Sequence, residues 1–471
     1  MFTEYTYQDW ENTPDKSAIL APIIKAYKAS DDFRVGLLAN QYFASENPET
    51  SKKMLLRPTV VESKDANGKV TKKNRTTKIP GNRVYSNFFF RFVTQQNQYL
   101  LGNGVTLDDD TAKEQLGLAF DKTVEQIGEK ALKHGVCWGY WNLDHLECIE
   151  AVADGMSGAV ALVDERTSEP MVLVQFWQIN TRRPLYIRVY EVQGISEYVA
   201  DKGGIRMVQD VTPYKLKVEK DALGVINATG EGYGVLPVVP FWASEEKRSE
   251  LTYAIKSKID MYDRILSDFG DNLDRACDIY WVLNNFGGTM SEIAETIAAI
   301  EQLKAVANIS DGTGSSSTVE PHTIDVPYAA RKEALELLEK QLYQDYMALS
   351  MSELTGGSLT NVAIETAMTN LNLKADRYEW QAHSFVQKVL GLVGVETEKI
   401  RFKRQSIANR SEIVQDIAVM RQDIDQRTAL MLNPYIEDQG EIDRIMNDTD
   451  AEKLTDMPMD KLDAAIRGDG Q

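Results

Sequence analysis

The most regular hydrophobic patterns in the chain lie in its second half. In three segments, apolar residues recur mostly at steps of three and four, which predicts helices that pack along a continuous seam. The seams contain Ile255, Ile259, Tyr262, Leu266, Phe269, Leu273, Ala276 and Tyr280; then Leu335, Leu338, Leu342, Tyr346 and Leu349; then Ile364, Met368, Leu371, Ala375, Tyr378, Ala382, Phe385 and Val389. We therefore predict three long helices, over 251–282, 330–349 and 363–394.

A different pattern fills the region from 135 to 243. Short apolar runs alternate with Gly, Asn and Asp, which predicts an antiparallel β region inside an otherwise helical chain. The predicted strands cover 136–141, 159–163, 171–177, 185–192 and 214–218. Before this region, residues 1–50 are predicted to be helical, 59–77 to form a hairpin that turns at 65–68, and 82–101 and 123–134 to form helices. The fold class is therefore α+β, mostly helical, with several domains.

The predicted hairpin carries Lys64, Lys69, Lys72, Lys73 and Arg75. Such a cluster is either a solvated surface or a basic finger that contacts DNA or an acidic partner, and we favour the solvated surface.

Shorter elements connect and follow the long helices. Residues 284–328 are predicted to form a small α/β insertion, with a helix near 291–303, a strand over 305–310 and a Gly/Ser-rich stretch over 311–317. A loop with two adjacent glycines separates the second long helix from the third. Another amphipathic helix, with Ile413, Ile417, Met420 and Ile424, is predicted to follow Ser411 as its N-cap.

Composition limits the classes of function. The 471 residues are enough for two to four domains, and 52 Lys+Arg against 71 Asp+Glu give a net charge of −19. That charge argues against tight binding of a phosphate backbone. Cys137, Cys148 and Cys277 are too few for a disulfide framework and fit a reducing compartment such as the cytoplasm. No secretory signal begins the sequence, and no apolar run reaches the roughly 18 residues of a membrane span, so we expect a soluble protein.

Motifs for catalysis or cofactor binding are sparse. His134-x-x-Cys137 and His145-x-x-Cys148 have a spacing that suits zinc, yet they also fit a hairpin that turns at 142–144. Both interpretations stay open, and we favour buried cysteines with incidental histidines. Phosphate-binding glycine loops, dinucleotide fingerprints and nucleophile elbows are absent from the sequence. The acidic runs 108–110 and 245–246 are typical of solvated faces. We predict no enzyme activity, no catalytic residues, no metal and no cofactor.

The order of the predicted elements resembles that of the portal proteins of long-tailed bacteriophages. The family typically has a strand with a Pro-Val-x-x-Phe-type segment, an acidic or polar turn, and a helix that reads Ile-Asp-x-Tyr-x-x-x-x-Ser-Asp. The matching residues here are 237–241, 245–249 and 259–268, and Tyr99-Leu100-Leu101-Gly102 resembles the family's Tyr-x-x-Gly ending. Trp242 stands where relatives often have asparagine. The likeness spans about 80–450.

This resemblance implies a ring subunit with wing, stem, clip and crown domains. The corresponding ranges are the wing at 1–246, the first stem helix at 247–283, the clip at 284–328, the second stem helix at 329–349, the tunnel loop at 350–362, the long wing helix at 363–402, the crown helices at 403–450 and an acidic flexible tail at 451–471.

The resemblance also implies where DNA would pass. The implied tunnel-loop residues are Met351, Glu353, Leu354, Thr355, Gly356, Gly357, Ser358, Leu359, Thr360 and Asn361. Five stem cations either centre the duplex or form ordinary ion pairs: Lys256, Lys258, Arg331, Lys332 and Lys340.

The implied partners are further copies of the chain in a dodecameric ring, weakly held double-stranded DNA, the terminase large subunit, a head–tail adaptor, and capsid and scaffolding proteins, with no membrane. The implied location is the portal vertex of the virion, after assembly in the bacterial host cytoplasm. Two alternatives remain from other classes. A metal-dependent hydrolase would use the acidic or His/Cys clusters, and a coiled-coil scaffold would explain the seams but leave 135–243 without a role.

Overall fold

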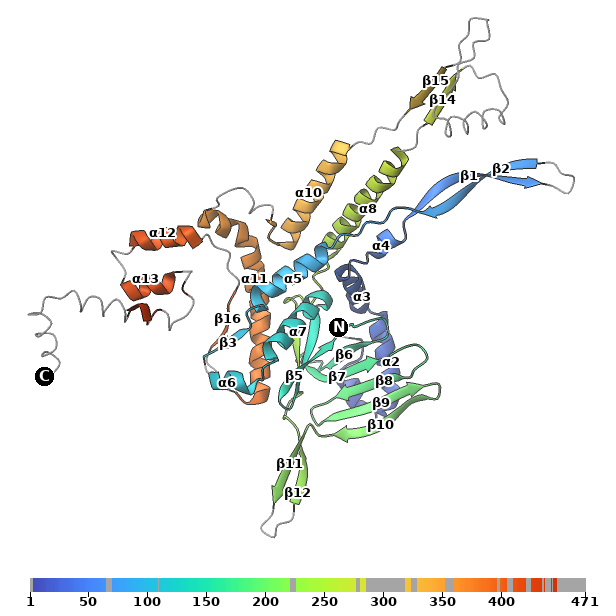
Figure 1. The fold of residues 1–471 in the computed structure, drawn as a ribbon. Helices are drawn as coiled ribbons and strands as arrows, with labels where there is room; N and C mark the ends of the chain where they lie inside the picture. Colours follow the sequence, from blue (N-terminus) through green and yellow to red (C-terminus); the bar gives the residue numbers. More distant parts are fainter. Residues whose placement is uncertain are drawn as a thin grey trace, which may run out of the picture. The chain divides into compact units, whose positions relative to one another are not determined.

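The computed structural model has α+β architecture with antiparallel sheets (Figure 1). It describes residues 3–64, 70–108, 110–220, 226–276, 280–284, 318–322, 328–351, 360–395, 399–404, 410–420, 425–433, 436, 442 and 444–446. The chain divides into two compact units. One contains residues 1–348 and 377–403, and the other contains residues 349–376 and 404–471.

The N-terminal segment is helical, as predicted. Its helices are α1 (Tyr7–Asn12), α2 (Lys16–Ala29), α3 (Asp31–Phe43) and α4 (Pro48–Ser51). The polar interruptions in this segment are helix caps. The side chains of Asp15, Ser30 and Asn47 accept backbone N–H groups at the starts of α2, α3 and α4, which satisfies donors that have no partner inside the helix.

A long antiparallel hairpin follows, formed by β1 (Met54–Lys64) and β2 (Val70–Pro80). Its register runs from Met54 opposite Pro80 to Lys64 opposite Val70. The predicted pairing is confirmed, and the strands are longer than the sequence pattern indicated. The predicted turn at 65–68 lies outside the described residues.

The predicted antiparallel β region is confirmed. A five-stranded meander has the order β10-β9-β8-β7-β6, and a three-stranded sheet has the order β13-β4-β5. The strands are β4 (Val136–Asn142), β5 (His145–Glu150), β6 (Gly158–Val163), β7 (Pro170–Trp177), β8 (Leu185–Tyr190), β9 (Ile195–Asp201), β10 (Gly204–Thr212) and β13 (Val238–Trp242), and β11 (Lys215–Lys220) pairs with β12 (Ile226–Glu231) in a separate hairpin. The sequence pattern missed β9, β10 and β12. All but one of the β10 residues are exposed, so its pattern carries no burial signal.

Two hydrophobic cores hold this first unit together. One lies between the five-stranded sheet and the N-terminal helices, where the buried Tyr27 ring meets Phe33 and Phe176 edge to face and its hydroxyl donates to Ala151 O at 3.0 Å. The other core is built from α5 (Phe88–Leu101), α7 (Phe120–His134) and the C-terminal part of α11 (Asn361–Val393).

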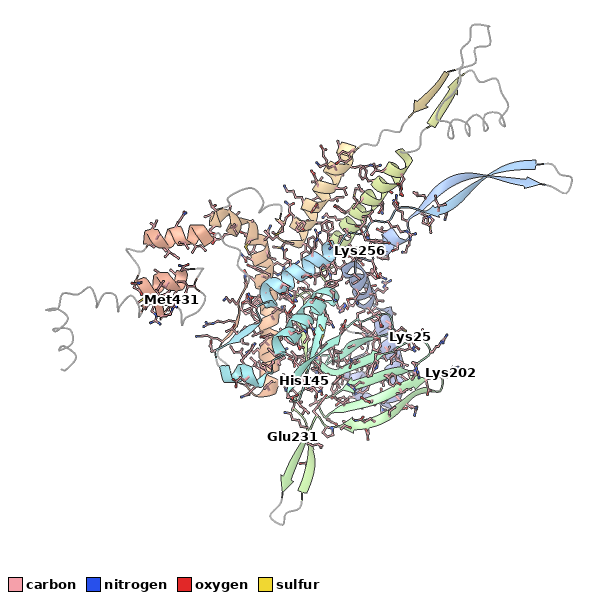
Figure 2. The ribbon with its side chains drawn as sticks, in the orientation of Figure 1. Lys25, His145, Lys202, Glu231, Lys256 and Met431 are labelled. Atoms are coloured by element: carbon pink, nitrogen blue, oxygen red, sulfur yellow. The ribbon has the colours of Figure 1, made fainter. Side chains whose placement is uncertain are left out.

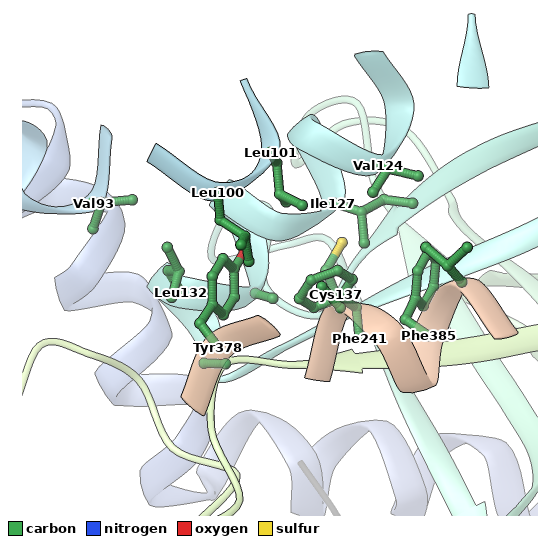
Figure 3. Packing of buried hydrophobic residues seen from close by; sticks show 14 of the residues in the cluster. Val93, Leu100, Leu101, Val124, Ile127, Leu132, Cys137, Phe241, Tyr378 and Phe385 are labelled. Atoms are coloured by element: carbon green, nitrogen blue, oxygen red, sulfur yellow. The ribbon is translucent and has the colours of Figure 1, made fainter. Parts of the chain in front are cut away.

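The long helix α11 buries the complete seam that its sequence predicts, from Ile364 to Val389. Figure 3 shows Tyr378 and Phe385 of α11 beside Cys137 and Phe241. The Phe241 ring centroid lies 5.6 Å from Tyr378 and 5.0 Å from Phe385, so the helix is held by aromatic contacts to strand β13.

Several predicted boundaries are wrong. The helix predicted over 82–101 begins only at Phe88. Before it the chain is extended, because the backbone N–H groups of Asn82, Val84 and Ser86 donate to side chains of another helix. The helix predicted over 251–282 is too long at its C-terminal end, because α8 (Tyr253–Ala276) ends earlier and Tyr280 lies in β14 (Tyr280–Asn284). Aromatic and β-branched residues at 280–282 suit a strand as well as they suit a helical seam.

The helix predicted over 363–394 is confirmed at its C-terminal end, since α11 ends at Val393. Gly394 takes the left-handed conformation with φ of 79°, which glycine adopts without strain. Residues beyond it return as β16 (Ile400–Phe402), which pairs with β3 (Val105–Leu107). Ser411 is the second residue of α12 (Arg410–Met420) and not its N-cap. The remaining short helices are α6 (Asp110–Gln115) and α13 (Gln426–Leu432), and the acidic tail at 451–471 lies outside the described residues.

The contact between Gly139 of β4 and α11 tests this core. A Cβ at Gly139 would lie 2.6 Å from Phe385 Cζ, so Gly139→Ala must displace a buried ring. We expect a loss of about 1–3 kcal/mol in the free energy of unfolding, measured by chemical denaturation. Gly391→Ala is the matched control in α11, the helix that carries Phe385. A Cβ at Gly391 meets nothing within 4 Å, so this substitution should raise the free energy of unfolding by about 1 kcal/mol. Equal effects of the two substitutions would contradict the packing described here.

Candidate functional site

Two long helices, α8 and α10 (Tyr328–Tyr346), lie side by side in antiparallel orientation (Figure 1). Lys258 near the start of α8 forms an ion pair with Asp345 near the end of α10. At the opposite ends, the rings of Phe269 and Tyr328 lie 5.8 Å apart. The sequence predicted both helices, and their pairing is a finding of the structure.

A strand pair continues this helix pair. Strand β14 follows α8 after a three-residue gap, and β15 (Thr318–His322) precedes α10. The two strands are antiparallel, with Tyr280 opposite His322 and Asn284 opposite Thr318. They therefore bring together the two ends of the segment that the sequence assigned to the clip. The predicted helix at 291–303, the strand at 305–310 and the Gly/Ser stretch at 311–317 lie outside the described residues.

Helix α5 connects the helix pair to the rest of the first unit through aromatic rings. Phe88 contacts Tyr262 of α8 with ring centroids 5.0 Å apart, and Phe92 stacks on Tyr346 of α10 at 4.6 Å. Tyr343 of α10 lies between them, 6.2 Å from Phe88 and 5.2 Å from Phe92. The N-terminal half of α8 and the C-terminal end of α10 are thus fixed against one turn of α5.

The buried face of α8 differs from the seam that the sequence predicts. Ile255 and Ile259 are 2% exposed, but farther along the predicted seam Tyr262 is only partly buried and Leu273 is 48% exposed. The buried stripe instead continues at every fourth residue through polar side chains. The full stripe is Ile255, Ile259, Asp263, Ser267 and Asp271. Periodicity of apolar residues cannot reveal this face, because its second half contains no apolar residue.

These polar side chains bind the backbone of the extended segment that follows β2. The N–H of Ser86 donates to Asp263 Oδ1 at 2.9 Å, and the N–H of Val84 donates to Ser267 Oγ at 3.0 Å. The N–H of Asn82 donates to Asp271 Oδ1 at 2.7 Å. Alternate residues of the strand-like segment therefore meet every fourth residue of the helix, in antiparallel order.

The two periods match physically. Four residues of α-helix rise about 6 Å, and two residues of extended chain span about 6.6 Å. The N–H groups of three alternate residues can therefore each find an acceptor without distortion of either element. We call this set of three hydrogen bonds the polar ladder of α8.

A second polar cluster surrounds the N-terminal end of the ladder. Asp260 accepts from the Tyr42 hydroxyl and from Asn47 Nδ2 at 3.0 Å, and Asn47 Nδ2 also lies 2.9 Å from Asp263 Oδ2. Burial raises the pKa of the Asp263 carboxyl above its usual range, although hydrogen bonds from Ser86 and Asn47 oppose the rise. Burial, together with the hydrogen bond to Asp260, raises the pKa of the Tyr42 hydroxyl. This cluster ties α3 and α4 to α8.

Three of the five predicted stem cations form ion pairs within the chain. Lys256, labelled on α8 in Figure 2, lies 2.7 Å from Asp260 Oδ2, and Lys258 pairs with Asp345. Lys332 lies 3.7 Å from Glu336 on the exposed side of α10. Lys340 is exposed, and Arg331 is partly buried with no hydrogen-bond partner for Nη1 among the described residues. Their role toward DNA stays a prediction.

Most of the predicted tunnel loop, residues 352–359, lies outside the described residues. At its edges, Met351 is 64% exposed. The Thr360 hydroxyl accepts the backbone N–H of Ala363, and Asn361 is already the first residue of α11. Thr360 and Asn361 therefore belong to the start of a helix, which the sequence pattern placed two residues later.

The cysteines of the two His/Cys pairs lie on the two strands of the β4–β5 hairpin, and His134 ends α7 before it. Cys137 Sγ lies 3.4 Å from Cys148 Sγ across strands β4 and β5, and buried His134 donates from Nε2 to Asn40 Oδ1 at 2.8 Å. His145 is exposed at the hairpin turn, where Asp144 and Glu147 flank it. Across the described residues, no three His, Cys, Asp or Glu side chains converge as ligands. Cys277 is not among those residues.

The order of elements is now an α/β body, a long helix, a strand pair, a returning helix and a third long helix, which agrees with the order on which the sequence resemblance to portal proteins rests. A family model described as phage portal protein, SPP1 Gp6-like, matches residues 60–453. The chain belongs to this family, as the sequence resemblance predicted. The family is structural rather than catalytic, and phage portal proteins are components of the virion.

Two curated relatives agree with the family assignment. The portal protein of Clostridium phage phiCD119 is 23% identical over 440 residues, which cover 87% of this chain and 91% of the relative. The portal protein of Bacillus phage SPP1 is 26% identical over 394 residues, which cover 74% of this chain and 72% of the relative. The hydrolase and scaffold alternatives gain no support. Within the described residues, no helix combines the length and apolar character that crossing a bilayer requires.

Buried His134 predicts an acid-side loss of stability. Burial, followed by Lys133 and Lys130, lowers the pKa of His134 from 6.5 to about 3. Between those values the unfolded chain binds a proton at this residue that the native chain does not bind. The free energy of unfolding therefore falls by on the order of 1 kcal/mol per pH unit from this residue as pH drops below 6.5.

This loss is measured by urea unfolding between pH 7 and pH 4, with His134→Gln as the comparison. The variant should be less stable at pH 7, because it disturbs a filled core, and should lose less stability on acidification than the natural chain. Parallel pH profiles of the two proteins would show that His134 is not the titrating group.

Proposed function

We propose that this portal protein acts as a closed homo-oligomeric ring, a dodecamer, around a channel through which double-stranded DNA enters and leaves the capsid. The observation that carries the proposal is the family match over 60–453, which includes the whole of the helix pair. Helices α8 and α10 support it, because both keep exposed apolar side chains that neighbouring subunits can cover: Met261 and Leu273 on α8 and Leu337 on α10.

The domain roles follow the element boundaries. Helices α8 and α10 form the stem. The clip is formed by residues 284–328, which begin at the last residue of β14 and include β15. The wing comprises residues 1–246 with α11, which extends only to Val393. The tunnel loop lies between α10 and α11, and α12 and α13 belong to the crown. The chain has no enzyme activity of its own in this proposal, and movement of DNA is driven by another protein.

Weak contact with DNA is the electrostatic basis of this role. A net charge of −19 per chain repels a polyanion, and every Lys or Arg contact to phosphate adds affinity that must be broken as the duplex advances. Lys256 and Lys258 are already paired with aspartates, so Arg331, Lys332 and Lys340 of α10 are the better candidates for centring the duplex. Even Lys332 has a glutamate neighbour, which keeps its attraction weak.

The tunnel loop supplies replaceable contacts to the moving duplex. Gly356 and Gly357 allow backbone rearrangement, and neutral hydroxyl and amide groups at Ser358, Thr360 and Asn361 exchange hydrogen bonds without trapping phosphate. The clip binds the terminase large subunit during filling and a head–tail adaptor afterwards. Capsid and scaffolding proteins surround the ring during assembly in the bacterial host cytoplasm.

The ring is tested first by negative-stain electron microscopy of the purified full-length chain. We expect rings with a central hole, because the stem faces of α8 and α10 that do not pack together need partners. The sample is examined over a range of concentrations, alone and together with the scaffolding protein. Compact monomers or dimers under all of these conditions would sink the ring proposal.

The tunnel loop is tested by replacing Gly356 and Gly357 together with proline. Proline fixes φ near −65° and removes an N–H donor, so the loop loses the rearrangements that a moving duplex requires. We expect rings to assemble normally while the yield of DNA-filled capsids falls in an infection supplied only with the variant. The matched control is replacement of both glycines with alanine, which keeps the donors. Normal packaging by the proline variant would reject the role of the loop.

A further inference from the structure

The base of the β1–β2 hairpin is held on α8 by one buried carboxylate. Lys53 directly precedes β1, and its Nζ lies 2.5 Å from Asp271 Oδ2. Asn82 follows β2 by two residues and donates its N–H to Asp271 Oδ1 at 2.7 Å. The two oxygens of Asp271 therefore contact both ends of the hairpin. Asp271 is 5% exposed, so water competes little for these contacts.

Neighbouring groups reinforce this contact from both sides. Lys53 Nζ also lies 2.8 Å from Asp268 Oδ1, and Asn82 Nδ2 lies 2.5 Å from Asp274 Oδ2. A Cβ at Gly81 would meet Leu55 at 3.0 Å and Asp271 at 3.1 Å, so the chain passes close to the carboxylate at this point. Lys53 Nζ and Asp271 Oδ2 have no aligned hydrogen bond, so their contact is one of charge.

The hairpin differs in charge from the chain that carries it. Strands β1 and β2 contain six Lys or Arg residues and a single Glu, whereas the chain has a net charge of −19. A basic ribbon on an acidic protein is attracted to many acidic surfaces, including those of its own chain. Its direction must therefore be set by contacts at its base that do not depend on the charges along its length.

We propose that Asp271, together with Ser267 and Asp263, is a positioning site that fixes the direction in which the basic hairpin leaves the first stem helix. The hairpin and α8 then move as one body. The contacts themselves lie within this chain, and only their consequence for DNA packaging rests on the proposed function.

The site explains a motif that the sequence likeness left without a role. In the run from Ile259 to Asp268, Asp260 holds α3 and α4, Ser267 accepts the N–H of Val84, and Asp268 pairs with Lys53. Ser267 and Asp268 thus bind the two ends of the hairpin. None of the contacts named here involves α10. The stem helix thus uses one face for its partner helix and another for the segments that flank the hairpin.

Hydrogen exchange of the full-length chain tests the site at its centre. Asp271→Ala removes both contacts, and exchange of the Asn82 amide and of hairpin amides should become about tenfold faster or more, as expected when a local opening loses a charge-assisted bond. Asp271→Asn keeps the Oδ1 acceptor, so it should retain most protection at Asn82 and lose only the charge contact with Lys53. Peptides from β6, in the other core, should exchange as in the natural chain.

A second set of variants removes either the donor or the acceptor of the hydrogen bond between Val84 and Ser267. Val84→Pro deletes the N–H that Ser267 accepts, whereas Val84→Ala shortens an exposed side chain and keeps that N–H. Val84→Pro and Ser267→Ala should each speed exchange at Ser86 and Asn82, and the double variant should add little to either, because both remove one bond. Val84→Ala should leave exchange unchanged.

The outcomes separate this proposal from the ring proposal. Unchanged hairpin exchange in Asp271→Ala, or an equal rise in β6 peptides, would overturn the positioning site whether or not rings form. If the natural chain forms no rings but the hairpin loosens as described, the positioning site stands and the ring proposal fails. With both in place, Asp271→Ala should reduce the number of DNA-filled capsids, and Asp271→Asn should restore part of the loss.

Discussion

The structure depends on the packing of one short helix, α5, at the place where three long helices meet. Its Phe88 and Phe92 contact aromatic residues of α8 and α10, and its Asn97 Oδ1 accepts from the Tyr378 hydroxyl of α11 at 3.0 Å. Gly128 of α7 permits this last contact, since a Cβ there would lie 2.4 Å from that hydroxyl. The aromatic rings supply buried area and the amide supplies a directed hydrogen bond, so α5 contacts all three long helices at one place.

Helix α8 is held on two unlike faces. One face packs on α10 through rings and an ion pair, where apolar area provides most of the attraction. The other face has no apolar residue beyond Ile259 and binds backbone N–H groups through Asp263, Ser267 and Asp271. Hydrophobic contact tolerates small sliding, but hydrogen bonds to buried carboxylates do not, because a displaced carboxylate would stay buried without partners. The polar face therefore fixes the register that the apolar face leaves free.

This division explains what the sequence could predict. All eight seam residues of α11 are buried, because they form one continuous apolar face along the helix. The α8 seam failed at Leu273 and Tyr280, since the true buried face becomes polar after Ile259 and the helix gives way to β14. A run of Asp, Ser and Asp at every fourth residue is a visible signal for such a face. This signal has meaning only beside an extended segment, and the sequence pattern predicts a helix for the segment in question, residues 82–86. The portal assignment survived these errors because it relied on the order of elements.

Net charge is a weaker guide to the channel than it first seems. Asp263 is 0% exposed and Asp271 is 5% exposed, while Asp260 is enclosed by Tyr42, Asn47 and Lys256. These carboxylates accept hydrogen bonds from donors within the chain and add little to the electrostatic field outside the protein. The acidic field of the stem must then come from exposed residues such as Glu333 and Glu336 of α10, on the helix that also carries the two exposed lysines at 332 and 340. In the proposed channel, repulsion of DNA would be tuned on α10, whereas Asp260, Asp263 and Asp271 of α8 bind partners within the chain.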